Sequence, residues 1–205
     1  MRHFKRFNVF IGPKEKVSLL YTDASRELHA AARTLGICKD RSTPGRPQSN
    51  GLAEAKVRKV LQGTRTVLEH AGMQPIYWSY ACRHFCFCHN HTKGYARGAE
   101  MPEPILGRKI PDNFHTPELY PFGCLVDFLP SPIFLRKFPQ WGSKAQPGVL
   151  LSYVTKPGGV WNSEYVVAML ADFQSGAKRP QVHTVREVVP MKVNENFVFS
   201  FERSI

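Results

Sequence analysis

The feature that most constrains this chain is a change of hydrophobic period near its middle. Up to residue 92, apolar residues recur mostly at helical spacing, whereas from residue 122 they form short runs separated by turn residues. Between these parts, residues 93–121 are broken by Pro and Gly and can hold only short helices. The sequence therefore predicts an α/β chain with three parts: a mixed region at 1–92, a connector at 93–121 and a β-rich unit at 122–205.

The first part is predicted to begin with a strand and a helix. Residues 16–23, "KVSLLYTD", form a compact apolar run that suits a buried strand ending at Asp23. Residues 24–37 have helical spacing, and Gly36 is the expected stop. The predicted buried face of this helix consists of Leu28, Ala31, Ala32 and Leu35.

A Pro-, Gly- and Ser-rich loop at 39–49 separates this helix from two more. Residues 50–71 have the pattern of a long amphipathic helix that closes at Gly72. Its predicted buried face consists of Ala53, Val57, Val60, Thr64 and Val67. A second helix is expected from Pro75 to about His91, and because it is apolar on most sides we expect it to be well buried.

The β-rich unit contains four strand-like runs, at 124–129, 147–154, 164–170 and 182–189. Turn residues separate them, which favours a small barrel or an antiparallel sheet. We expect Trp141 and Trp161 to lie in the core of this unit rather than to form a platform for stacking bases.

The charge of the chain indicates a polyanionic partner. The formal net charge is +12 and the isoelectric point is near 9.7, so nucleic acid is favoured, with an acidic protein or membrane surface second. Residues 40–66 concentrate this charge, with a net charge of +4. Their basic residues are Arg41, Arg46, Lys56, Arg58, Lys59 and Arg65, and their acids are Asp40 and Glu54.

The cysteines and the apolar segments indicate a compartment. The five cysteines are odd in number, and no N-terminal stretch has the pattern of a secretory signal. No window reaches the length of about 18 apolar residues that spans a bilayer, so no membrane partner is expected. We therefore expect free thiols and an intracellular location, and a nuclear one if DNA is the partner.

Two acids, Asp23 and Glu54, suggest a metal site. Asp23 ends the predicted strand, and Glu54 opens a helix after a flexible loop. Carboxylates in this layout can hold Mg²⁺, and two such ions can clamp both sides of a phosphodiester. The alternative is that Asp23 caps the next helix, while Glu54 favours a helix N-terminus through the helix dipole and pairs with Arg58.

Several blocks of the sequence resemble one family. "YTDASREL", then "LGI", then "STPGRPQSNGLAEAKVRKVLQGTRTVL" resemble the integrase catalytic core of copia-type retrotransposon Pol polyproteins. Downstream, "YWSYACRHFCFCHNHT", "LYPFGCLVDF" and "PGVLLSYVTKPGG" are similar to later blocks of the family, and their order is kept from about residue 15 to 173.

The resemblance implies a partial ribonuclease H-like integrase core, with a mixed sheet and helices, followed by the β-rich unit. It implies magnesium-dependent polynucleotidyl transfer, in which DNA ends are processed by water and a 3′-hydroxyl then attacks target DNA. Asp23 and Glu54 would be the second and third acids of an Asp-Asp-Glu triad that holds Mg²⁺ or Mn²⁺. The residues expected to contact DNA are Arg46, Gln48, Asn50, Lys56, Arg58 and Lys59.

The sequence also departs from the family. No Asp precedes Asp23, so the first acid of the triad has no counterpart here. The usual Asp-Asn-Gly is replaced by Asp23-Ala24-Ser25, and the Arg that follows the family's catalytic Glu is Ala55. We therefore expect this chain alone to bind metal weakly and to be impaired in catalysis.

One dense group of potential zinc ligands lies in the second long helix: Cys82, His84, Cys86, Cys88, His89 and His91. Thiolates and imidazoles can bind zinc. On a helix, however, these residues divide between two faces, so we expect them to belong to the core rather than to a zinc site.

Three functions remain open from the sequence. The chain could be an integrase-derived polynucleotidyl transferase acting on retrotransposon ends and target DNA. It could instead be a non-catalytic DNA-binding remnant, or an assembly fragment that forms homo-oligomers through its β-rich unit. Salt-sensitive DNA binding without magnesium dependence would distinguish the second, and salt-insensitive self-association the third.

Overall fold

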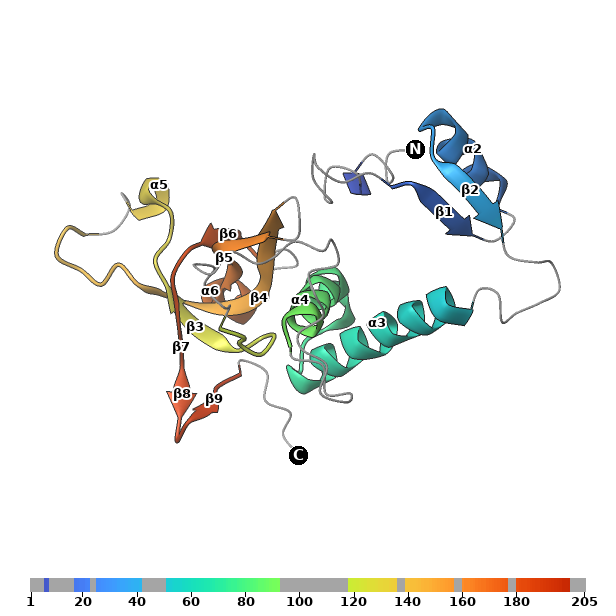
Figure 1. Cartoon of the computed structure of the whole chain (residues 1–205). Coiled ribbons are helices and arrows are strands. Elements are labelled where there is room, and N and C mark those ends of the chain that lie inside the picture. The colour runs from blue at the N-terminus through green and yellow to red at the C-terminus, as the bar shows by residue number, and fades with distance from the viewer. Residues whose placement is uncertain are drawn as a thin grey trace.

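The fold was taken from a computed structural model (Figure 1), which describes residues 6–7, 17–22, 25–41, 51–92, 118–135, 139–156, 160–176 and 180–199. Asp23, Arg46, Gln48 and Asn50 lie outside the described residues, as does most of the connector at 93–121. Within the part of the chain that is described, no helix is both long and apolar enough to cross a membrane.

The first described unit is a parallel β-α-β arrangement. Strands β1 (Leu19–Thr22) and β2 (Cys38–Arg41) pair in parallel and are connected by helix α2 (Arg26–Thr34), which confirms the predicted strand and helix. Gly36 has a φ of +65°, so it ends this helix in the left-handed conformation that favours glycine. Ala31 and Ala32 are buried against the strands, as predicted.

Strand β1 is not buried as predicted. Leu19 and Tyr21 are 55% and 46% exposed, whereas Thr22 is buried. Alternate residues of a strand point to opposite faces of the sheet, and α2 covers only one face. The apolar run therefore identifies the strand correctly but overestimates how much of it is covered in the described structure.

Helix α3 (Gly51–His70) is followed by a short 3₁₀ turn, η2 (Pro75–Tyr77), and helix α4 (Trp78–His91). The predicted buried face of α3 is only half right: Thr64 is buried and Val67 half-buried, but Ala53 and Val57 are exposed. Figure 1 shows why, because only the C-terminal half of α3 lies beside α4 and the sheet while the N-terminal half projects away from them.

Helix α4 buries one face rather than most of its surface. Ala81, His84 and Phe87 are buried, but Trp78 at its start is 62% exposed. The buried residues recur at spacings of three, so they form a single stripe that faces the sheet. The prediction that this helix is well buried is therefore wrong for its outer face.

The β-rich part forms a five-stranded antiparallel sheet in the order β6-β5-β4-β3-β7, which confirms the predicted antiparallel sheet. Two short helices, α5 and α6, and a small hairpin, β8-β9, accompany it. The bounds are β3 Leu125–Phe128, α5 Pro132–Leu135, β4 Gln146–Lys156, β5 Val160–Met169, α6 Leu170–Gln174, β6 Val182–Val185, β7 Val188–Pro190, β8 Lys192–Val193 and β9 Asn196–Phe197.

The connection between β6 and β7 shows that the sheet curls. These strands form its opposite edges, yet only Arg186 and Glu187 separate Val185 from Val188. Three residue steps span at most about 11 Å, whereas the edges of a flat five-stranded sheet lie about 19 Å apart. The sheet must therefore bend until its edges approach one another, which gives the unit a barrel-like form.

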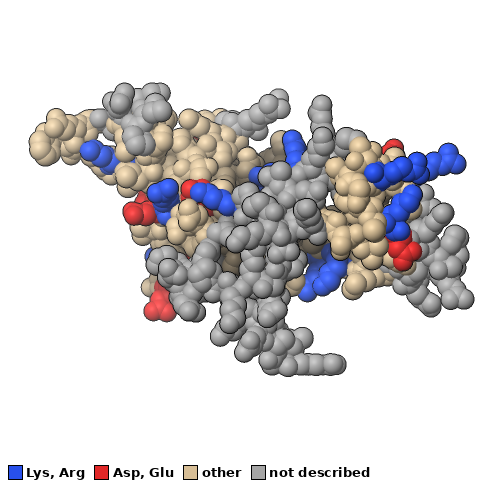
Figure 2. All heavy atoms as spheres, turned by 45° about the horizontal axis from the view of Figure 1, so that its top comes forward, with Lys and Arg blue, Asp and Glu red and all other residues tan. Residues whose placement is uncertain are grey.

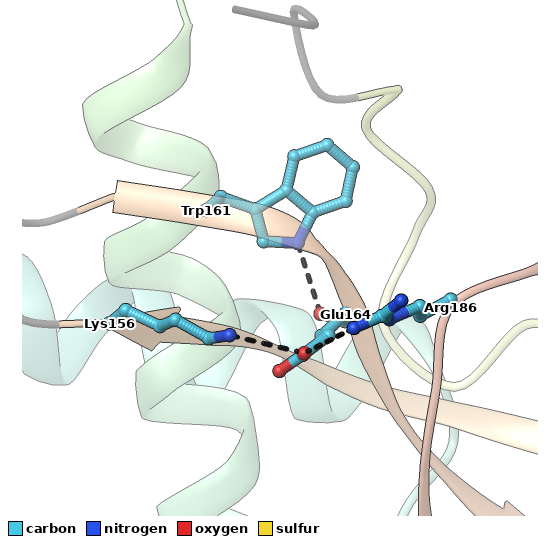
Figure 3. Close-up of polar contacts among 4 residues, drawn as sticks. All are labelled: Lys156, Trp161, Glu164 and Arg186. Carbon is cyan, nitrogen blue, oxygen red and sulfur yellow. Dashed lines mark hydrogen bonds and ion pairs between the residues drawn. The ribbon is translucent and has the colours of Figure 1, made fainter.

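A polar network fastens this connection to the end of the β4-β5 hairpin (Figure 3). The half-buried carboxylate of Glu164 on β5 lies 3.3 Å from Lys156 Nζ on β4 and 4.0 Å from Arg186 Nη2 in the β6-β7 link. The indole N–H of Trp161 donates to the Glu164 carbonyl oxygen at 3.0 Å. Trp161 is buried as predicted, but Trp141 is 92% exposed, so the prediction that it lies in the core is wrong.

The main core joins the helices to the sheet. Leu68, Ala71 and Ala81 from the α3-α4 region pack with Val149 and Leu151 of β4. Farther along α4, Phe87 stacks on Tyr153, with ring centroids 4.1 Å apart, inside a second cluster of sheet residues. Helix α4 and the end of α3 are thus held rigidly against the curled sheet.

A candidate site on the exposed half of α3

Glu54 lies in the first turn of α3, and its side chain is exposed. The free N–H groups and the dipole of a helix N-terminus favour a negative charge at this position. Among the described residues no ion pair joins Glu54 to Arg58, so the alternative in which these two side chains neutralise each other is not observed. The carboxylate is accessible to an external cation.

Asp23 lies outside the described residues, but the strand before it does not. Asp23 follows Thr22, the last residue of β1, and β1 runs parallel to β2. The carboxyl ends of parallel strands meet at one edge of a sheet, which is where sites form in such arrangements. After β2 the chain leaves from this same edge and returns at Gly51 to begin α3.

Helix α2 has a capping residue of its own within the described structure. The N-cap is Ser25, whose hydroxyl accepts a hydrogen bond from the Leu28 backbone N–H at 3.5 Å. A helix has one N-cap residue. The alternative prediction that Asp23 caps this helix falls on a residue outside the described ones.

The three predicted basic residues of α3 are all exposed, but they lie on two different faces. Arg58 lines a shallow hollow along α3 together with Glu54 and Arg65, and with the apolar side chains of Val57 and Leu61. Lys56 and Lys59 lie on the side that faces α4. The structure thus separates Arg58, on the face of Glu54, from the two lysines.

The charge of the whole molecule does not by itself mark a site. Figure 2 shows Lys and Arg side chains spread along the face that it draws rather than gathered in one patch. The formal net charge of +12 is therefore a general attraction for polyanions, and any specific contact must come from local geometry.

Such a local arrangement occurs where α3 and α4 pack. A Cβ atom on Gly63 would lie only 2.1 Å from the ring of Phe85, so the absence of a side chain lets this ring cover α3 closely. The ring of His89 stacks on Phe85, with centroids 5.6 Å apart and planes at 4°. His89 is exposed, and its pKa is lowered by partial burial and then by the charges of Lys59 and Lys56.

Sequence reasoning placed His89 only in the Cys/His group and missed its neighbours. A signal existed, because the short connection between the two helices predicts antiparallel neighbours. The charges of Lys56 and Lys59, in the earlier turns of α3, act on His89 near the end of α4.

Several side chains of the Cys/His group are buried or half-buried where α4 packs against its neighbours. His84 is buried, and its Nε2 atom lies 2.9 Å from the Tyr120 carbonyl oxygen, to which it donates as the Nε2–H tautomer. Burial lowers the pKa of His84 to about 4. Burial raises the pKa of Cys88 to about 12, and burial with the neighbouring Cys82 raises that of Cys86 to about 11.

These values make the two thiols poor metal ligands, because zinc binds the thiolate. Within the described ranges, no three His, Cys, Asp or Glu side chains lie close enough together to hold a metal ion. All five cysteines are free, which confirms the predicted free thiols. Cys82, Cys86 and Cys88 are half-buried rather than fully buried as expected for core residues.

Comparison with known proteins adds two similarities. No protein-family profile matches the chain. One similar solved structure is that of a simian T-cell lymphotropic virus intasome in complex with PP2A regulatory subunit B56 gamma. The alignment covers 86% of this chain and 59% of the matched chain, at 15% sequence identity and a TM-score of 0.38. That score is too low to establish a shared fold.

The sequence similarity is more specific. Over 100 residues, or 49% of this chain, the sequence is 30% identical to the retrovirus-related Pol polyprotein from transposon TNT 1-94 of tobacco, Nicotiana tabacum. The match spans only 7% of the length of that polyprotein. About half of the chain is thus similar to a small part of a retrotransposon Pol polyprotein.

Proposed function

We propose that this chain is an integrase-like segment of a retrotransposon Pol polyprotein, with a ribonuclease H-like core of the copia type, that acts on DNA in the nucleus. The observation that carries the proposal is the accessible carboxylate of Glu54 in the first turn of α3, preceded in the sequence by the motif Pro47-Gln48-Ser49-Asn50-Gly51. The similarity to a retrotransposon Pol polyprotein supports it.

The proposed reaction is polynucleotidyl transfer, with processing of DNA ends followed by attack of a 3′-hydroxyl on target DNA. Asp23 and Glu54 are the acids proposed to hold Mg²⁺ or Mn²⁺, and the donor set fits because hard divalent cations prefer carboxylate oxygens. The parallel pairing of β1 and β2 supports a role for Asp23 at the carboxyl edge of the strands. When bound, such an ion supplies charge stabilisation for the transferring phosphate.

The residues of this chain would bind and orient the DNA. Arg58 shares a face of α3 with Glu54, so it is proposed to guide the scissile phosphate toward the acids. Lys56 and Lys59 would hold the duplex on the side facing α4, and Arg46, Gln48 and Asn50 are proposed contacts in the preceding loop. Because residues 1–22 contain no Asp, the first Asp of the triad would have to come from outside this stretch, and weak metal binding and impaired catalysis are expected for the chain alone.

The test compares the chain with Glu54→Gln in Mg²⁺ or Mn²⁺ titration and in nicking and strand-transfer assays on a short DNA duplex. Glutamine keeps the size of the side chain but removes its charge, so we expect metal affinity to fall at least tenfold and any metal-dependent nicking to be lost. Glu69→Gln, at the other end of α3, is the matched control and should behave like the unmodified chain. Equal metal affinity in all three proteins would exclude Glu54 as a ligand.

A second candidate function is DNA binding without turnover. The exposed Lys56, Arg58 and Lys59 favour it, because they bind phosphates whether or not a metal site is complete. DNA binding that is lost in high salt but unaffected by chelation of metal, with no nicking under any condition, would support this candidate over the first.

A further inference from the structure

We infer that His89 of α4 is an additional DNA-contacting residue, which joins Lys56 and Lys59 to form a phosphate-binding corner between α3 and α4. This inference rests on the proposed DNA-binding function. It extends the interface from one helix to two and makes the affinity for DNA depend on pH. The corner consists of Lys56, Lys59 and His89.

The first step of the argument is geometric. Helix α3 ends at His70 and α4 begins at Trp78, so a short connection makes the two helices neighbours. They make close contact at Gly63, because the Phe85 ring occupies the space that a side chain there would need. One turn after Phe85 on α4 comes His89, and one turn before Gly63 on α3 comes Lys59.

The second step concerns the orientation of the imidazole. Its ring is parallel to the Phe85 ring within 4°, at a centroid distance of 5.6 Å. Phe85 is itself half-buried between the helices. The stacking restricts the rotamers of His89, so the ring is held beside the lysines before any ligand arrives, and less side-chain entropy is lost on binding.

The third step is electrostatic. The charges that act on His89 from the packed helix α3 are those of Lys59 and Lys56, and both disfavour protonation of the imidazole. A phosphate bound between the three side chains reverses this effect, because it neutralises the lysines and attracts the imidazolium. Binding of DNA is therefore coupled to uptake of a proton by His89, and by linkage the DNA affinity rises as the pH falls.

The direction of the pH dependence of DNA affinity follows from the pKa of His89 in the free chain and in the DNA complex. In the free chain this pKa lies below its usual value, because of partial burial and of the charges of Lys59 and Lys56. A bound phosphate would raise it. The proton is therefore bound preferentially in the complex at acidic pH, and this contribution is lost as the pH rises toward 8. We therefore expect DNA to bind several-fold more tightly at pH 5.5 than at pH 8 through this residue.

The experiment measures the affinity of the whole chain for a fluorescently labelled DNA duplex by anisotropy, from pH 5.5 to 8 at low salt with EDTA. EDTA removes divalent cations, so the result is independent of the proposed metal site. His89→Gln should lose the part of the pH dependence that His89 provides, and His89→Lys should bind tightly at all pH values. The control is His70→Gln at the far end of α3, which should keep the pH dependence of the unmodified chain.

NMR of the imidazole protons gives a second readout, in which the pKa of His89 should rise when DNA is added. His89 is exposed, so these substitutions leave the core unchanged. An unchanged pH dependence in His89→Gln, with normal DNA affinity at pH 8, would overturn this inference but leave the proposed function intact. A failure of the chain to bind DNA at any pH would instead overturn DNA binding itself.

Discussion

The two halves of α3 carry the same amphipathic pattern but have different surroundings. In the C-terminal half, Thr64 and Leu68 are only 7% and 8% exposed, and Leu68 packs with Ala81 of α4 and with β4. In the N-terminal half, Val57 and Leu61 are 59% and 53% exposed. The comparison teaches that periodicity identifies which stripe of a helix is apolar, whereas coverage of that stripe depends on elements distant in sequence.

The difference in burial between the two halves of α3 bears on the candidate site. The buried half anchors α3 to the α4-sheet core, while the exposed half carries Glu54 and the cations. A helix held rigidly at one end can present charged side chains at the other end in a fixed direction. This arrangement suits an interface for a large polyanion better than a closed pocket for a small ligand.

The largest expected effect comes from truncating the same residue type in both halves. Leu68→Ala removes buried methyl groups and should lower the free energy of unfolding by about 2–5 kcal/mol. Leu61→Ala, about two turns earlier, removes exposed ones and should change it by less than about 1 kcal/mol. Urea denaturation measures both values. Similar losses for the two variants would mean that the N-terminal half of α3 is covered in solution as well.

A smaller effect, of pH on stability, is expected at His84 on the buried face of α4. His84 has a folded-state pKa of about 4, lowered by burial and partly opposed by its hydrogen bond to Tyr120, against about 6.5 when unfolded. The folded state therefore disfavours the protonated imidazole, so stability is full above pH 6.5 and falls as the pH drops toward 4. The loss should reach about 3 kcal/mol.

Thermal unfolding between pH 4 and 7.5 measures this loss, and His84→Gln should flatten the profile over that range. His70 provides a control, because its side chain is exposed and His70→Gln should leave the profile unchanged. A profile that stays equally steep in His84→Gln would show that other groups cause the acid sensitivity.

The smallest expected effect is at the boundary between the two halves. Gly63→Ala forces the Phe85 ring to move and should cost about 1–3 kcal/mol, and it should also weaken the pH dependence of DNA binding through His89. Gly51→Ala is the matched control, since nothing lies within 4 Å of its added Cβ, and it should stabilise the helix by up to about 1 kcal/mol. Chemical denaturation of the two variants checks the opposite signs. A Gly63→Ala variant as stable as Gly51→Ala would contradict the close packing of α3 on α4.

The sequence by itself determined the types of element and several of their ends. Helical spacing predicted α2, α3 and α4, Gly36 marked a helix end, and short apolar runs predicted the strands of the sheet. These features depend on backbone preferences and side-chain spacing over a few residues, so they can be read from neighbouring positions. The same local reading identified Glu54 as an acid at a helix start, and the pairing of this residue with Asp23 remains a prediction.

Only the tertiary structure decided how those elements are covered and joined. The run at 182–189 was predicted as one strand, but it divides into β6 and β7 at opposite edges of the sheet. Trp161 is buried and Trp141 exposed, although both lie in the β-rich part. Phe85 packs closely over Gly63 and stacks on His89, whose pKa is affected by the charges of Lys59 and Lys56 from α3. Burial and pKa depend on which distant residues come within a few ångströms, and local spacing does not carry that information.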